Sequence, residues 1–129
     1  MDNLKQQIID FAKNDGVSLI GFAEKKRFDG VDPQHNPFSI FPEAKTVILL
    51  GKRICRGSLR GIEEGTNFGD YQLFGKNWLE DEFLALSAYN LTNFIESHGW
   101  EAVPHYPAVP EGNGTTQSPV APGKLPPDI

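Results

Sequence analysis

The sequence predicts an α+β domain with a small mixed sheet and two main helices. Apolar residues recur at helical spacing near the N-terminus and again from Asn77 onward. Between them, two short β-branched and apolar stretches, residues 17–23 and 45–54, are typical of strands. With 129 residues, 39% of them apolar, the chain has the length of one domain or part of one.

The first helix is predicted from Leu4, Ile8 and Phe11, which fall on one helical face. Asp2 or Asn3 can cap its start, and "NDG" at 14–16 ends it with Gly16 in a left-handed conformation. "VSLIGFA" at 17–23 follows directly, and it is too short for a helix. We therefore expect a helix, a tight turn and a strand.

The strongest strand is predicted at residues 45–54, "KTVILLGKRI". Val47 to Leu50 are continuously apolar, which suits a central strand buried on both faces. The preceding residues 24–44 contain three prolines and no periodicity, so we expect a long ordered loop. Phe38, Ile40 and Phe41 are expected to hold this loop against the core.

The second helix is predicted from "NWLE", with Asn77 as the cap, or from near Asp70 if Gly75 is tolerated inside it. It ends at "SHG", with His98 near the negative helix end and Gly99 just beyond. "WEAVPHY", residues 100–106, is predicted as a third strand. The aromatic residues of this middle region are Phe68, Tyr71, Phe74, Trp78 and Trp100, and most of them are expected in the core.

The predicted domain covers residues 1–110, and residues 111–129 form a connector or a tail. Seven of the ten prolines follow residue 103, and this last stretch has no apolar pattern. Three strands leave open sheet edges, which favours an incomplete domain whose last residues lead to a further part. A disordered tail is the alternative.

Composition limits the classes of function. The net charge of −5 gives no direct indication of nucleic-acid binding, which depends on many Lys and Arg contacts to phosphate. Cys55 is the only cysteine, so the chain by itself cannot form a disulfide, an iron–sulfur cluster or a structural zinc site. The N-terminus lacks a secretory pattern and no apolar run approaches membrane-span length, so a cytoplasmic location without a membrane is expected.

A basic cluster after the central strand is the first candidate site. Anionic ligands bind at the ends of parallel strands in open sheets, so these residues are candidates for a phosphate or carboxylate. The glycines fit no phosphate-loop pattern, and a solvated basic face balanced by Glu63 and Glu64 is the alternative. The cluster consists of Lys52, Arg53, Arg56 and Arg60.

His105 and Tyr106, at the end of the predicted third strand, are the second candidate site. Both side chains can transfer protons, and histidine titrates near neutral pH, so His105 is the candidate catalytic residue. Simple surface exposure beside prolines is the alternative. Tyr71 is a further candidate for ligand binding, in addition to Arg53, Arg56 and Tyr106.

The order of elements resembles that of epoxyqueuosine-reductase-like proteins, which are related to reductive dehalogenases. "IIDFAKNDGVSLIGFAE" is similar to their opening helix and strand, and "FPEAKTVILLGKRI" to their second strand with its Pro-x-Ala turn. "GDYQLFGKNWLEDEFLALSAYNLTNFIESHGWEAVPHYP" resembles their following helix and strand. The resemblance covers roughly residues 4–110.

This resemblance implies a nitroreductase-like, corrinoid-binding type of fold and a role in redox chemistry. In the family, the N-terminal region helps to bind cobalamin, and a later part carries two [4Fe–4S] clusters on cysteine motifs. An Asp-Thr-Ala-Pro stretch supplies an acidic residue near the corrinoid, where this chain reads "HYPA" with His105 in the acid's place. The expected function is therefore the N-terminal part of such a protein, inactive alone.

Two other functions stay open. The chain is alternatively a non-catalytic binding or assembly domain that dimerises through its strand edges. A flavin-dependent nitroreductase-like protein is the third possibility, but no Arg, Ser and Asn cluster for FMN stands out.

Overall fold

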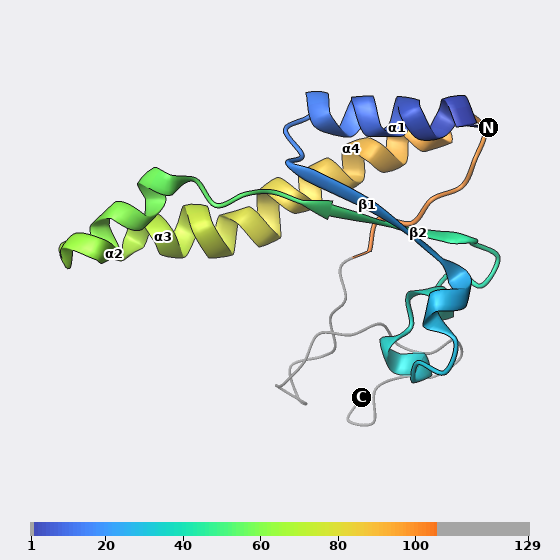
Figure 1. Ribbon diagram of the computed structural model, residues 1–129, viewed down its shortest axis with the longest axis horizontal. Helices are drawn as coiled ribbons and strands as arrows, with labels where there is room; N and C mark the ends of the chain where they lie inside the picture. Colours follow the sequence, from blue (N-terminus) through green and yellow to red (C-terminus); the bar gives the residue numbers. More distant parts are fainter. Residues whose placement is uncertain (1, 106–129) are drawn as a thin grey trace. The chain divides into compact units, whose positions relative to one another are not determined.

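The computed structural model describes residues 2–105, which contain both helices and strands, so the α+β class is confirmed (Figure 1). Its main elements are α1 (Asp2–Asn14), β1 (Leu19–Glu24), β2 (Thr46–Gly51), α2 (Arg60–Glu64), α3 (Gly69–Gln72) and α4 (Ala85–Glu96). The described chain divides into two compact units, residues 2–21 with 49–104 and residues 22–48 with His105. The predicted connector, residues 111–129, lies outside the described residues.

The first helix forms as predicted. Ile8 and Ala12, four residues apart, are both buried, so they mark the face that packs against the rest of its unit. The helix ends where Gly16 adopts a φ of 88°, a left-handed conformation that glycine accepts without steric cost. The buried Val17 then returns its main-chain N–H to the Ala12 carbonyl, which leads the chain into β1.

The two strands pair in an antiparallel sense. Ser18 near the start of β1 donates its N–H to the carbonyl of Gly51 at the end of β2. Beyond the other end of the pair, Lys25 donates to Lys45. The described residues thus contain a two-stranded antiparallel sheet, and the expected mixed sheet with a parallel-type second strand is wrong.

β2 is not a central strand buried on both faces, as its apolar run suggested. Leu49 is 61% exposed, and Leu19 of β1 is 73% exposed. The third strand is also absent from the described residues, since Trp100–His105 have no regular structure. Pro104 cannot donate to a ladder. The apolar run in the sequence therefore does not show how many strands lie beside β2.

The second helix begins early, at Gly69, and continues to Glu96. Its middle consists of two π-helical segments, η5 (Leu73–Asn77) and η6 (Leu79–Leu84), in which hydrogen bonds join residues five apart. Asn77 lies inside this helix, so its predicted capping role is wrong, whereas the alternative start near Asp70 is confirmed. His98 follows the last turn with Nδ1 2.9 Å from the Phe94 carbonyl, and Gly99 has a φ of 86°.

The core of the first unit lies where α1 meets α4 (Figure 1). The rings of Phe11 and Phe94 stack with centroids 4.4 Å apart. Leu91 and Ile95 of α4 are buried beside them. None of the helices among residues 2–105 has the length and apolar character that a membrane span requires.

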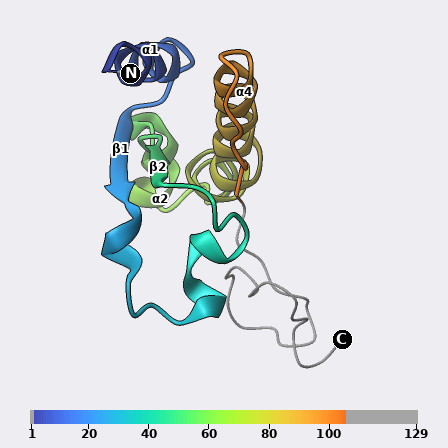
Figure 2. The same ribbon diagram turned by 90° about the vertical axis from the view of Figure 1, so that its right-hand side faces the viewer.

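The second unit consists of short turns between β1 and β2 (Figure 2). Phe38 is buried and meets Phe28 edge to face, with centroids 5.4 Å apart. Asp32 and Asn36 cap the turns that contain Gln34 and Phe38. Ile40 is 47% exposed, so the expectation that it holds the loop to the core is wrong, whereas Phe38 does take a buried place in its own unit.

Candidate functional site

The basic segment begins where β2 ends, and its first residue, Lys52, contacts the turn that follows α1. Lys52 Nζ lies 3.1 Å from the Gly16 carbonyl oxygen and 3.4 Å from that of Asp15. A cation in this place is favourable because the last carbonyls of a helix carry partial negative charge. The main-chain N–H of Arg53 donates to Ser18 Oγ at 3.0 Å. These bonds attach the start of the segment to the α1–β1 turn.

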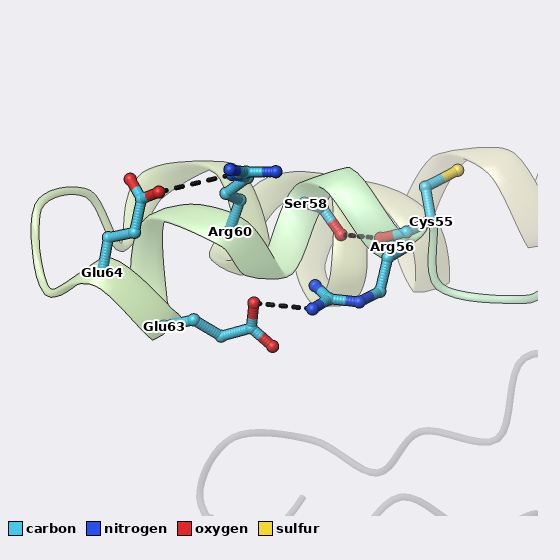
Figure 3. A network of polar contacts seen from close by, with 6 residues as sticks. All are labelled: Cys55, Arg56, Ser58, Arg60, Glu63 and Glu64. Carbon is cyan, nitrogen blue, oxygen red and sulfur yellow. Dashed lines mark hydrogen bonds and ion pairs between the residues drawn. The ribbon is translucent and has the colours of Figure 1, made fainter.

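Two of the predicted arginines form ion pairs (Figure 3). Arg56 pairs with Glu63 at 2.9 Å, and Arg60 pairs with Glu64 at 3.3 Å, one helical turn apart. All four side chains are at least half exposed, so each pair contributes little to stability. This arrangement is what the alternative of a balanced basic face predicts. A cofactor-binding role of Arg56 stays a prediction.

A small open hollow lies beside this segment in the first unit. Its volume is about 270 Å³, and Lys52 and Arg53 provide the charged residues of its lining. None of the lining residues is acidic. Cys55 is exposed there as a free thiol, and Phe74 and Phe83 are 47% and 38% exposed. The lining residues are Gly16, Ser18, Lys52, Arg53, Cys55, Phe74, Leu79 and Phe83.

The π-helical geometry explains why the helix contributes three apolar residues to this hollow. Phe74 and Leu79 are five residues apart, a spacing that an α-helix rotates to different faces. Hydrogen bonding between residues five apart widens the turn and returns them to one side. Phe83 follows four residues after Leu79 and continues the row. The sequence carried no signal for this geometry, and Phe74 was grouped with the aromatic residues of which most are expected in the core.

Tyr71 packs within its own helix and is half-buried. A Cβ at Gly75 would lie 2.7 Å from Tyr71 Cδ1 and 3.2 Å from Ile54 Cγ2. Glycine at position 75 therefore allows the tyrosine ring and Ile54 to approach the helix. Tyr71 does not line the hollow. Its ligand role stays a prediction.

The aromatic residues of the middle region are more exposed than the sequence suggested. Phe68 is 62% exposed, Trp78 37% and Trp100 51%, so the expectation that most of them are core is wrong. Phe74 and Trp78 meet edge to face, with centroids 5.0 Å apart. An aromatic pair of this kind is stabilising even at a partly exposed position.

His105 belongs to the second unit, whereas Arg53, Arg56 and Tyr71 belong to the first. Desolvation by neighbouring atoms lowers the pKa of the His105 imidazole below its ordinary value of 6.5. A lowered pKa leaves the ring neutral at pH 7, the form that accepts a proton. Tyr106 lies outside the described residues. The catalytic role of His105 therefore stays a prediction.

Among residues 2–105, no three His, Cys, Asp or Glu side chains gather as metal ligands would. Comparison of the chain with family models, curated proteins and solved structures returned no match.

Proposed function

We propose that this chain is the corrinoid-facing N-terminal part of an epoxyqueuosine-reductase-like cytoplasmic redox protein with a nitroreductase-like fold, inactive alone. The sequence resemblance supports this proposal, and the open hollow beside the start of β1 and the end of β2 is the structural observation that carries it. Lys52 and Arg53 line that hollow beside exposed Phe74 and Phe83. Positive charge next to apolar surface suits a ligand with anionic and apolar parts.

The hollow accommodates one edge of a corrinoid rather than the whole ring. Its volume of about 270 Å³ is below the range of pockets that enclose a drug-sized ligand. Arg53 and Lys52 would hold a phosphate or an amide oxygen, and Ser18 would contribute a hydroxyl. Bound cobalamin would supply the reducing chemistry. The chain thus provides one wall of a larger site.

Iron–sulfur clusters do not fit this chain. Each [4Fe–4S] cluster needs four cysteine ligands, and Cys55 is the only cysteine. Electrons would therefore have to come from a separate part of the protein. The isolated chain is expected to bind a corrinoid without reducing it.

Titration with hydroxocobalamin tests this proposal. A visible spectrum that shifts on addition of the chain, together with co-migration on gel filtration at micromolar concentration, would support it. Arg53→Gln should weaken this binding, whereas Arg60→Gln, which removes the same charge from an ion pair, should not. A spectrum and mobility of free cobalamin well above micromolar concentration would overturn it.

The sheet supports a second candidate, an assembly domain that dimerises through its strand edges. Leu19 and Leu49 line an apolar depression of about 350 Å³, together with Gly21 and Gly51. β1 and β2 each have an edge that no other described strand covers. Both features are typical of surfaces that another strand or chain covers.

Sedimentation of the wild type and of Leu49→Lys distinguishes this candidate. A strand-mediated dimer should dissociate in Leu49→Lys and persist in Leu86→Lys, which introduces the same charge at a similarly exposed place on α4. A monomeric wild type would exclude the dimer and leave the corrinoid proposal intact.

A further inference from the structure

The hollow beside the basic segment has a chemistry of its own, independent of any corrinoid. Its lining combines two positively charged residues, Lys52 and Arg53, with two aromatic residues, Phe74 and Phe83. Lys52 Nζ already donates to the carbonyls of Asp15 and Gly16, in the turn that follows α1. Arg53 takes part in none of the ion pairs Lys26–Glu24, Arg56–Glu63 and Arg60–Glu64, and it is exposed.

A second observation directs attention to the same place. The hollow is lined by residues from both π-helical segments, Phe74 of η5 and Leu79 and Phe83 of η6. π-helical turns are less favourable than α-helical ones and occur frequently at functional sites. In this π-helical region, Phe74 is 47% exposed and Phe83 38%, although burial of these side chains would be more favourable.

We propose that this hollow binds a small planar aromatic molecule that carries a carboxylate or a similar anionic group. The ring would lie against Phe74 and Phe83 in offset or edge contact. The anionic group would pair with Arg53, with Ser18 Oγ and Lys52 close by. A volume of about 270 Å³ suits a ligand of one or two fused rings.

The single thiol offers a direct readout. Cys55 is the only cysteine of the chain, is exposed, and lines the same hollow. A bound ligand should therefore slow alkylation of Cys55 by N-ethylmaleimide. The probes are 2-naphthoate and its neutral counterpart 2-naphthamide, which share the ring system and differ in charge.

We expect 2-naphthoate to protect Cys55 and to bind at least about tenfold more tightly than 2-naphthamide, the factor that one charge-assisted contact supplies. Arg53→Gln should abolish this preference, and Phe74→Ala should weaken both probes. Arg60→Gln is the matched control, because it removes the same charge from the Arg60–Glu64 pair outside the hollow. In this variant, the ratio of the Cys55 alkylation rates with and without probe should equal the wild-type ratio.

Three results would overturn this inference. They are equal protection by the two probes, wild-type preference in Arg53→Gln, and alkylation that neither probe slows. Circular dichroism of each variant should match the wild type, and ¹⁵N chemical-shift changes on adding 2-naphthoate should centre on Ser18, Arg53 and Cys55. A chain that binds naphthoate and leaves cobalamin free would support this inference while overturning the corrinoid proposal.

Discussion

Two regions of the first unit contain the same kinds of apolar residue and use them differently. At the contact of α1 with α4, Phe11 stacks on Phe94 and Leu91 is 5% exposed. On the sheet and along the π-helical segments, Leu49 and Phe74 are 61% and 47% exposed. Apolar character is therefore not what separates them. The difference is that α1 and α4 bury these residues against each other, whereas Leu49 and Phe74 stay largely exposed among the described residues.

The two regions contribute differently to stability. Burial of apolar surface stabilises the α1–α4 contact, because each buried side chain loses contact with water. The exposed face gains less from folding, since Leu49 and Phe74 stay 61% and 47% exposed. Its apolar groups are typical of a surface that a ligand or another chain covers.

The sharpest test replaces a leucine on each side of one helix. Leu91→Ala should lower the free energy of unfolding by about 2–5 kcal/mol, because it opens a cavity in the α1–α4 contact. Leu86→Ala, at a position 58% exposed on the same helix, should change it by less than about 0.5 kcal/mol. Denaturant unfolding of both variants measures the difference. Similar losses for the two would show that the face of Leu86 is covered in solution.

A glycine pair tests the turn that returns the chain from α2 to α3. A Cβ at Gly61 would collide with the carbonyl oxygen of Asn67 and lie 2.9 Å from Asn67 Cβ. Gly61→Ala should therefore cost about 1–3 kcal/mol of stability, since main chain must move. Gly57, four residues earlier, has open space at the same position, so Gly57→Ala should be close to neutral. Thermal unfolding that ranks the two variants in the opposite order would contradict the described turn.

A smaller effect is expected where the basic segment meets α1. Lys52→Gln removes a cation from the Asp15 and Gly16 carbonyls and should cost about 0.5–1.5 kcal/mol. Lys52→Arg, which keeps the charge, should retain part of this stability. Unfolding at low and high salt is the measurement, because screening should reduce the loss in Lys52→Gln. A loss independent of salt in both variants would indicate packing rather than charge.

The smallest effect concerns His105. Because the folded protein binds the imidazole proton less tightly than the unfolded chain, this residue destabilises the fold once protonated. Stability should be full above about pH 6.5 and decline as the pH falls through that value toward the lowered pKa. His105→Gln should remove this part of the decline. Titration of the His105 ring by NMR should give a midpoint below 6.5, and a higher midpoint would contradict the desolvation.

Local signals in the sequence were sufficient to predict where the two main helices end at their C-terminal sides. Gly16 and Gly99 follow amphipathic patterns, and each adopts the left-handed conformation that its position requires. The early start of the second helix could be stated only as an alternative, because a glycine inside a helix is unfavourable by propensity. Gly75 is accepted since the Tyr71 ring and Ile54 occupy the space that a side chain would take.

The sequence singled out some of the residues that line the hollow, and the tertiary structure adds the others. The basic segment after β2 was identified from charge alone, and Arg53 does line a hollow. Which arginines are paired depends on the path of α2, which brings Glu63 within 2.9 Å of Arg56. The apolar residues that the helix contributes to the hollow could not be predicted, because α-helical periodicity does not place Phe74 and Leu79 on one side of the helix.

By itself, the sequence determined the α+β class, the limits of α1, the two strands, and the charge of the segment that follows them. These features depend on side-chain periodicity and on the conformational freedom of glycine, both of which act within a few residues. Only the tertiary structure decided that the strands pair antiparallel, that Leu49 is exposed, and that the second helix has π geometry. Those properties depend on which surfaces meet, and neighbouring residues along the chain do not specify that.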